Sequence, residues 1–255
     1  TVYDILNIQF DSYNGEAFYN DKMQAVVDEL KEKNLLTESE GAQVVQLPNF
    51  PPCLITKQDG ATLYATRDLA AAFYREQEYK PAKVLYVVGN EQSLHFKQLF
   101  SVIELMGYDW AHRLQHVPFG MMLKDGKKMS TRKGRVILLK EVLQEAIEIA
   151  AKTIKEKNPQ LENSEEVAKQ VGVGAVIFHD LKNFRLHDVE FSIEQMLSFE
   201  GETGPYLQYT YARIQTLLSK ASVDSSSIEL IELLDNSAWS GILHLHDYPT
   251  IVEKA

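Results

Sequence analysis

The chain has 255 residues, of which 45% are hydrophobic and 24% charged, and its formal net charge is -10. This composition is typical of a globular protein with one large domain or two small ones. No apolar run approaches the roughly 18 residues that span a bilayer, which excludes a membrane-spanning protein. The acidic charge argues against a protein that coats DNA or RNA without selectivity. The single cysteine, Cys53, excludes an internal disulfide and a cysteine-rich metal site, and with the lack of a signal peptide it favours a cytoplasmic setting.

The first part of the chain alternates predicted helices and strands. Met23, Val26, Val27 and Leu30 lie at helical spacing and predict an amphipathic helix at the end of segment 12–36. The elements predicted next are a strand at 42–47, a hairpin at 52–66 around the turn Asp59-Gly60, and a helix at 67–79 closed by Lys80-Pro81.

A strand and a helix follow one another closely in the middle of the chain. Residues 84–88 form a continuous apolar run, which is typical of a strand buried on both faces, and Gly89 bounds it. A helix is predicted at 93–107, with Ser93 as its N-cap and Gly107 as its C-terminal stop. Strand, tight loop and helix are half of a βαβ unit, so the sequence up to about residue 118 is predicted to be part of a doubly wound α/β domain.

The remainder of the chain is predicted to be helical. Helices are expected at 136–158, 164–183, 203–221 and over the last 25 residues, with a polar loop at 222–227. Leu207, Tyr211, Ile214 and Leu218 form one apolar stripe on the third of these helices. The change of character places one boundary near residue 118 and a second near residue 198.

Two groups of polar residues are candidates for a binding site. Ligands of open parallel sheets lie beyond the carboxyl ends of the strands, where Gly89 permits close approach of the backbone and Gln92 and His95 offer polar side chains. Asp68 is predicted in the first turn of its helix, four residues after Tyr64, and this pair suits a guanidinium or ammonium ligand. Each group also has a purely structural explanation. The first can be a polar surface loop with a capping serine, and in the second the helix dipole can stabilise the acid Asp68.

The segment 126–134, GKKMSTRKG, is a strongly basic loop in an acidic protein. Asp125 is the only acid between Arg113 and Lys140. Positioned Lys and Arg stabilise the charge of a phosphoryl-type transition state, and Gly and Ser allow such a loop to close over ATP and reopen. A solvated basic face is the alternative interpretation. The segment is not a Walker A loop.

These motifs resemble one family. Lys128-Met129-Ser130 is similar to the K-M-S-K-S loop of class I aminoacyl-tRNA synthetases. Three segments occur in the order and spacing of arginyl-tRNA synthetases: DGATLYATRDLAAAFYR (59–75), YVVGNEQSLHFKQLF (86–100) and HVPFGMMLKDGKKMSTRKG (116–134). Segment 201–214, GETGPYLQYTYARI, resembles the start of that family's helical anticodon-binding domain. The resemblance covers nearly all of the chain.

The resemblance implies roles for named residues. Tyr64 and Asp68 would bind the guanidinium and ammonium ends of L-arginine, and Gln92 would help to hold the amino acid. Gly89 and His95 would lie towards ATP, and the backbones of Met121 and Met122 would flank the adenine. Lys128, with Met129 and Ser130, would stabilise the phosphates as the carboxylate of arginine attacks the α-phosphorus. Mg²⁺ would accompany the ATP, with no metal site on the protein itself.

Two departures from the family pattern qualify these roles. Thr131 stands where the family has a second loop lysine, and Arg132 or Lys133 is the candidate substitute. The chain also has no His-x-Gly-His, the signature of the other half of a class I nucleotide site, because none of its seven histidines fits: His95, His112, His116, His179, His187, His244 and His246. The chain is therefore expected to be an internal piece of a longer protein, inactive in isolation.

The sequence thus predicts an α/β, Rossmann-like class I catalytic part followed by an α-helical region. The expected divisions are 1–118 (catalytic), 119–197 (mobile loop and helical linker) and 198–255 (truncated start of the anticodon-binding bundle). The expected parent function is ATP-dependent ligation of L-arginine to tRNA(Arg) through arginyl-adenylate. One alternative is a non-catalytic fragment that binds tRNA or a partner through Tyr206, Tyr209 and Arg213, and another is a related nucleotidylyltransferase, which Tyr64, Asp68 and Gln92 argue against.

Overall fold

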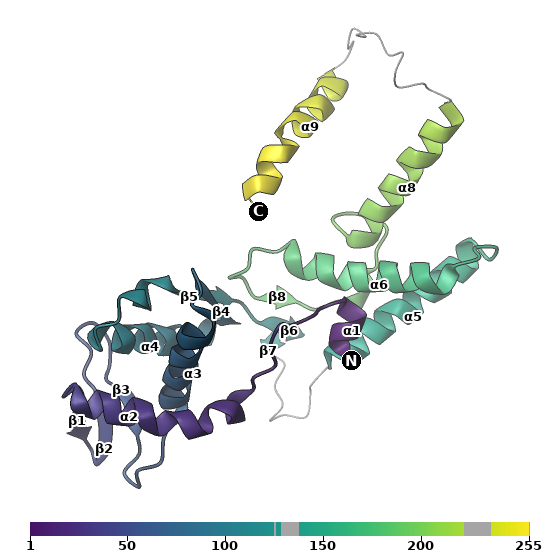
Figure 1. Ribbon diagram of the computed structural model, residues 1–255. Coiled ribbons are helices and arrows are strands. Elements are labelled where there is room, and N and C mark those ends of the chain that lie inside the picture. Colours follow the sequence, from purple (N-terminus) through teal and green to yellow (C-terminus); the bar gives the residue numbers. More distant parts are fainter. Residues whose placement is uncertain (125, 129–137, 222–235, 255) are drawn as a thin grey trace. The chain divides into compact units, whose positions relative to one another are not determined.

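The computed structural model describes residues 1–124, 126–128, 138–221 and 236–254. Contacts between elements divide the chain into two units, Thr1–Leu207 and Gln208–Ala255. The first unit combines helices with three small sheets, one of them parallel, whereas the described part of the second is helical (Figure 1). The predicted class, an α/β part followed by a helical region, is confirmed.

The N-terminal segment provides the first layer of the core. It contains α1 (Val2–Leu6), the 3₁₀ helix η1 (Glu16–Lys22) and α2 (Met23–Glu32). The four residues predicted to form the apolar face of α2 are all buried: Met23, Val26, Val27 and Leu30. The amphipathic helix predicted from their spacing is therefore confirmed.

A three-stranded antiparallel sheet follows, formed by β1 (Leu36–Ser39), β2 (Ala42–Val45) and β3 (Cys53–Thr56). The predicted turn is present, since Gly60 has a φ of +79° and its N–H donates to Lys57 O at 2.9 Å. The predicted hairpin is only partly correct. The second arm pairs through the bridge Thr56 to Thr62, and the chain enters the next helix at Tyr64, two residues later.

Helix α3 (Tyr64–Tyr79) begins one turn earlier than the sequence predicted. Its Thr66 hydroxyl donates to Ile55 O at 2.5 Å and is fully buried, which fixes the first turn of α3 against β3. The helix ends at Lys80, whose φ of +43° precedes Pro81, as predicted. Asp68 consequently lies in the second turn of α3, and the prediction that the helix dipole stabilises it from the first turn was wrong.

Strands β4 (Val84–Gly89) and β5 (Leu114–Phe119) form a two-stranded parallel sheet. The prediction that β4 is buried on both faces was wrong, because Leu85 is 54% and Val87 63% exposed while Val84, Tyr86 and Val88 pack on the core. A continuous apolar run is compatible with burial of either face, so periodicity could not identify the uncovered side.

Helix α4 (Ser93–Leu105) connects these strands, flanked by the 3₁₀ helices η2 (Asn90–Gln92) and η3 (Asp109–Arg113). Gly107, with a φ of +88°, follows the end of α4 as predicted. The N-cap prediction was wrong: Gln92 holds that position, and the Ser93 hydroxyl donates instead to Asn90 O at 2.7 Å.

The second half of the first unit surrounds another small sheet, in which β6 (Met122–Lys124) lies between β7 (Lys127–Lys128) and β8 (Val189–Glu190). Helices α5 (Leu139–Lys157) and α6 (Ser164–Leu181) pack side by side, and α7 (Ile193–Met196) follows (Figure 1). Helices α8 (Gly204–Ala221) and α9 (Asn236–Lys254) complete the described chain. None of the helices, as far as the structure describes them, has the length and apolar character to cross a membrane.

Two buried groups predict a loss of stability at alkaline pH. Burial raises the pKa of the Cys53 thiol to about 11, and burial together with a hydrogen bond to Glu29 Oε1 raises the pKa of Tyr108 to about 12. Both folded-state values lie above those of the unfolded chain, which are about 8.5 for cysteine and about 10 for tyrosine, so the stabilisation is complete only below about pH 8 and is lost as the pH rises through 11 and 12.

We therefore expect the free energy of unfolding from urea titrations to be level up to about pH 8 and to fall progressively above it, most steeply above about pH 10. The free energy of unfolding of Tyr108→Phe should fall less steeply with pH, because the phenylalanine ring cannot ionise. Tyr3→Phe, which changes an exposed tyrosine, is the matched control and should follow the wild-type profile. Identical profiles for Tyr108→Phe and the wild type would contradict the assignment.

Candidate active site

The parallel sheet brings two of the predicted site segments to one edge. Gly89 at the end of β4 is paired with Phe119 at the end of β5. The segments that leave these strands, which carry Gln92 and Met121, therefore start from the same carboxyl edge. Gln92 lies in η2 and is exposed, and Gly89 is buried. Ligands of open parallel sheets lie beyond the carboxyl ends of the strands, so this edge is the candidate site.

Helix α3 brings a second set of polar groups to the site. Tyr64 and Asp68 are four residues apart, so they lie on the same face of the helix. The Tyr64 side chain is 74% exposed, and the Asp68 side chain is 40% exposed. An aromatic ring and a carboxylate that both reach solvent on one helical face suit a cationic ligand.

Asp68 is in direct contact with His95. His95 Nε2 lies 2.6 Å from Asp68 Oδ2, and this pair joins the second turn of α3 to the first turn of α4. The His95 ring also contacts the buried Phe96 edge to face, with ring centroids 5.3 Å apart. Phe96 in turn stacks on His116 of β5 at 4.6 Å. The family resemblance implied that Asp68 binds arginine and that His95 lies towards ATP. No local pattern in the sequence predicts that the two side chains touch.

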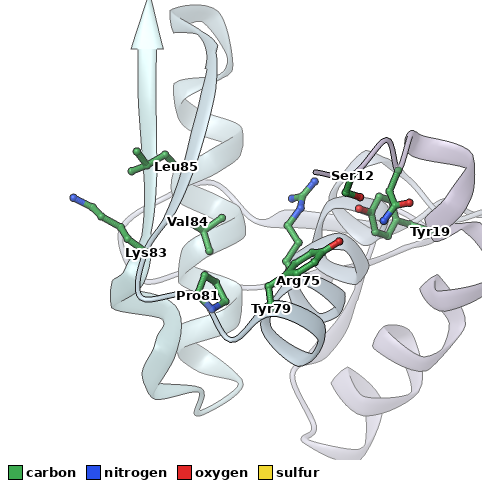
Figure 2. A pocket seen from close by; sticks show the side chains of 9 residues that line it. Ser12, Tyr19, Arg75, Tyr79, Pro81, Lys83, Val84 and Leu85 are labelled. Atoms are coloured by element: carbon green, nitrogen blue, oxygen red, sulfur yellow. The ribbon is translucent and has the colours of Figure 1, made fainter. Parts of the chain in front are cut away.

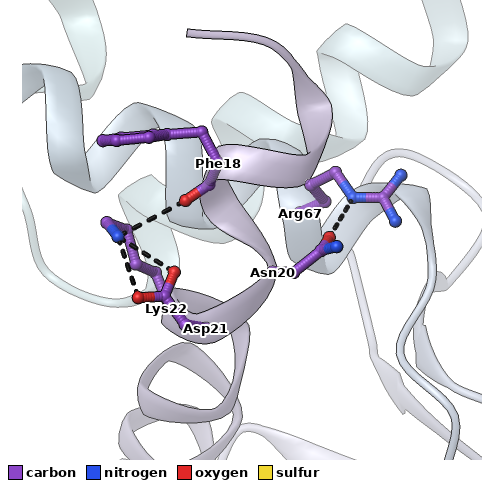
Figure 3. A network of polar contacts seen from close by, with 5 residues as sticks. All are labelled: Phe18, Asn20, Asp21, Lys22 and Arg67. Atoms are coloured by element: carbon purple, nitrogen blue, oxygen red, sulfur yellow. Dashed lines mark hydrogen bonds and ion pairs between the residues drawn. The ribbon is translucent and has the colours of Figure 1, made fainter.

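The residue before Asp68 holds α3 in place. Arg67 Nη1 donates to Glu16 Oε2 at 2.8 Å, and Arg67 Nε donates to Asn20 Oδ1 at 3.2 Å, the second bond being drawn in Figure 3. Both bonds tie α3 to η1. In the same figure Lys22 binds Asp21 and the Phe18 carbonyl, so η1 has its own polar support. Arg67 therefore directs its charge to η1, and Asp68 is the group of this pair that faces α4.

A cavity of about 420 Å³ lies at the other end of α3, where Arg75 points towards Ser12 and Tyr19 (Figure 2). The Arg75 guanidinium carbon is 5.7 Å from the Tyr19 ring centroid and 5.5 Å from that of Tyr86. The lining of this cavity includes none of the site residues predicted from the sequence. A cavity of about 590 Å³ between α2 and α3 does not include them either. The predicted site residues therefore lie outside these two cavities.

The segment before the basic loop is anchored by residues 185–190. Gly120 N–H donates to Arg185 O at 2.8 Å, and Met121 N–H donates to Asp188 Oδ1 at 2.7 Å. The Met121 carbonyl accepts from Val189 N–H at 2.9 Å. Both backbone groups of Met121 therefore already have partners. A Cβ at Gly120 would lie 2.1 Å from His187 O, which explains the glycine.

Glu190 supports the turn that leads into the loop, since its carboxylate accepts from Gly126 N–H at 3.2 Å. The pairing of Leu123 with Lys128 places the backbone of Lys128 at the end of this β6–β7 hairpin. The predicted loop residues Met129, Ser130, Thr131, Arg132 and Lys133 lie outside the described residues. The anchoring by 185–190 had no signal in the sequence, because the partners are more than 60 positions apart.

The residues predicted to face tRNA are all on α8. Tyr206, Tyr209 and Arg213 are exposed, and so are the residues of the predicted apolar stripe: Leu207, Tyr211, Ile214 and Leu218. The first turn of α8 differs, because Gly204 and Pro205 are buried.

The described residues offer no resident metal site. They contain no group of three or more His, Cys, Asp or Glu side chains that can hold an ion.

The comparisons with known proteins point to one family. Residues 1–193 match the family described as "tRNA synthetases class I (R), catalytic domain". The chain is 57% identical to an "Arginine--tRNA ligase" of Exiguobacterium sp. (strain ATCC BAA-1283 / AT1b), over 100% of this chain and 45% of the relative. It spans just under half the length of the curated relatives.

Two solved structures are also similar. The arginyl-tRNA synthetase of Plasmodium falciparum is 30% identical with a TM-score of 0.75, over 89% of this chain and 39% of that protein. That of Thermus thermophilus is 25% identical with a TM-score of 0.73, over 89% of this chain and 46% of that protein. The chain therefore belongs to the class I (R) family of tRNA synthetases, and residues 1–193 match its catalytic domain.

Proposed function

We propose that this chain provides the amino-acid-binding part of an enzyme that ligates L-arginine to tRNA(Arg) in the cytoplasm. The observation that carries the proposal is the position of Asp68, beside Tyr64 on one face of α3 and in contact with α4 at the carboxyl edge of the parallel sheet. A carboxylate with an exposed tyrosine suits a guanidinium, since charge-assisted hydrogen bonds are the strong ones and the planar guanidinium also stacks on rings.

In the first proposed step, a carboxylate oxygen of arginine attacks the α-phosphorus of ATP, and the bond to pyrophosphate breaks. Asp68 and Tyr64 hold the guanidinium and ammonium ends, and Gln92 helps to orient the amino acid. These contacts fix the attacking oxygen near the sheet edge. Holding two bound reactants in the right geometry lowers the entropic part of the barrier to the transfer. In the second step a ribose hydroxyl at the end of the tRNA takes the arginyl group, and AMP leaves.

The ATP side of the proposal uses Gly89, His95, Met122, Lys128 and the loop that follows. Lys128 would stabilise the charge that develops on the phosphates, with Met129, Ser130, Arg132 and Lys133 following it in the chain. Mg²⁺ would arrive with ATP. Since the Met121 backbone groups bind Asp188 and Val189, we assign Met121 to support of the adenine site and leave the contact with the base to Met122.

We further propose that residues 1–118 are the C-terminal part of the catalytic domain, 119–197 the loop and helical linker, and 198–255 the start of an anticodon-binding bundle. The family match ends at residue 193, close to the second of these boundaries. The exposed Tyr206, Tyr209 and Arg213 on α8 support a contribution of this bundle to tRNA binding. Loss of tRNA affinity on Tyr209→Ala, with arginine binding unchanged, would support that assignment.

The proposed function is tested by arginine-dependent exchange of pyrophosphate into ATP, with tRNA(Arg) present. The 255-residue chain should show no exchange, because it has no His-x-Gly-His and the outer face of β4 is uncovered at Leu85 and Val87. A form extended to the length of the relatives should show exchange that depends on arginine and not on lysine. Exchange by the chain alone would contradict the first expectation, and exchange that lysine supports equally would contradict the substrate assignment.

A further inference from the structure

The carboxylate proposed to bind arginine already has a partner in the protein. His95 Nε2 is 2.6 Å from Asp68 Oδ2, within the range of a charge-assisted hydrogen bond. The two side chains are 24% and 40% exposed, so the pair lies at the surface of the site and a solute can reach Asp68. A cationic amino acid that binds Asp68 must therefore either share this carboxylate with His95 or displace His95 from it.

The surroundings of the pair favour replacement. The aromatic contact with Phe96 supports one side of the His95 ring, and Phe96 is itself buried against His116. Because the buried Phe96 anchors α4 in the core, a turn of the partly exposed His95 ring would cost its edge contact with Phe96 and leave α4 in place. Other charged or titratable side chains on the neighbouring elements include Tyr64, Arg67 and Arg75 on α3, Tyr86 on β4, Tyr19 on η1, Glu91 on η2, Lys97 on α4 and His116 on β5.

Most of these neighbours are engaged elsewhere. Arg67 binds Glu16 and Asn20, Arg75 lies against the Tyr19 and Tyr86 rings, and His116 Nε2 lies 3.0 Å from the Val88 carbonyl. Within the described residues, His95 is the only group that forms an ion pair with Asp68. The charge of His95 therefore decides how firmly Asp68 is held before a substrate binds.

We propose that His95 is a positioning residue that holds Asp68 in the free protein and yields it to the cationic end of the amino acid, so that protonation of His95 weakens arginine binding. The inference rests on the proposed function, because it takes Asp68 as the arginine carboxylate. An imidazolium and a guanidinium cannot both sit closely on one carboxylate without mutual repulsion. Arginine binding should thus release a proton at acidic pH.

The direction of the effect follows from histidine chemistry. An imidazole changes charge between about pH 5 and 8, and the neutral form holds a carboxylate less strongly than the charged form. Arginine affinity should rise about tenfold between pH 5.5 and 7.5, as expected when binding releases one proton over part of this range. His95→Gln keeps a side-chain N–H donor but cannot take up a proton. Its arginine affinity should change less than about twofold over the same range.

The test is a calorimetric titration with L-arginine at pH 5.5, 6.5 and 7.5. It compares the wild type with His95→Gln, Asp68→Asn and the control His112→Gln, which changes an exposed histidine on η3. The 255-residue chain is used first, and the protein extended to the length of its relatives if the chain does not bind. The wild type and His112→Gln should share the pH dependence, and His95→Gln should lack it.

The outcomes separate this inference from the proposed function. If Asp68→Asn binds arginine as the wild type does, or if neither length of the wild type binds, the proposed function fails and the inference fails with it. If Asp68→Asn loses binding and His95→Gln keeps the full pH dependence, only the role of His95 is overturned. A wild-type affinity that is independent of pH would overturn it as well.

Discussion

Asp68→Asn is expected to lower the affinity for L-arginine about 100-fold, which corresponds to about 2.7 kcal/mol. The substitution keeps the size of the side chain but removes the charge that makes its hydrogen bonds to a cation strong. Because the Asp68 side chain is 40% exposed, the unfolding temperature should change little. Calorimetry measures the affinity, and a thermal melt followed by circular dichroism checks the fold.

Asp180→Asn is the matched control for this prediction. Asp180 is an exposed carboxylate on α6, so its loss removes the same charge from the protein at another place. Arginine affinity should stay within about twofold of the wild type in the control, because exposed charges far from a ligand are screened by salt. Equal losses in both variants would show that net charge and not the site determines binding, and an unaffected Asp68→Asn would remove Asp68 from the site.

Gly172→Ala is expected to lower the free energy of unfolding by about 1 kcal/mol, the difference between the cost of overpacking and the gain in helix propensity. Gly172 is buried in α6, and a Cβ there would lie 2.7 Å from both Ile147 N and Ile147 Cα of α5. These are backbone atoms, so the two helices must move apart to admit the methyl group. Overpacking of this kind costs about 1–3 kcal/mol, which outweighs the roughly 1 kcal/mol by which alanine favours a helix over glycine.

Gly241→Ala is the matched control, and it is not expected to lower the free energy of unfolding. Gly241 is inside α9, and a Cβ at this position meets no atom within 4 Å. The substitution should therefore leave the unfolding of α5 and α6 unchanged and raise the helicity of α9. Urea titrations followed by circular dichroism measure both variants. A stable Gly172→Ala protein would mean that α5 and α6 are less closely packed than the structure indicates.

The local patterns of the sequence predicted the longer helices and the strands β2 to β4, and missed the short elements such as α1, α7 and the strands from β5 onward. The spacing of Met23, Val26, Val27 and Leu30 predicted α2 and its buried face, and the Asp59-Gly60 pair predicted a turn in which Gly60 has the required left-handed backbone. Strand β1 was not predicted, because its sequence LTES has no apolar alternation and it forms only through pairing with β2. Its existence depends on a partner strand and not on its own composition.

In the candidate site, too, local motifs predicted which residues take part, whereas the contacts between residues far apart in the sequence could not be predicted. Residue types and resemblance selected Tyr64, Asp68, Gln92 and His95, and the structure places Asp68 and His95 in contact across 27 positions. No periodicity predicts that contact, since it depends on how α3 packs on α4. The same applies to Asp188 and Glu190, whose carboxylates reach Met121 and Gly126 across 67 and 64 positions. Such residues follow from a tertiary structure and not from a motif.

The central claim is that α3 and the carboxyl edge of the parallel sheet form a site selective for arginine. The most direct measurement is a calorimetric titration of the wild type with L-arginine and, separately, with L-lysine at pH 7.5, on the 255-residue chain and on the form extended to the length of its relatives. The account predicts that at least the extended form binds arginine and that lysine binds at least about tenfold more weakly, because a point-charge ammonium cannot use Tyr64 and Asp68 as a planar guanidinium does. Equal affinity for the two amino acids, or no binding by either form, would contradict it.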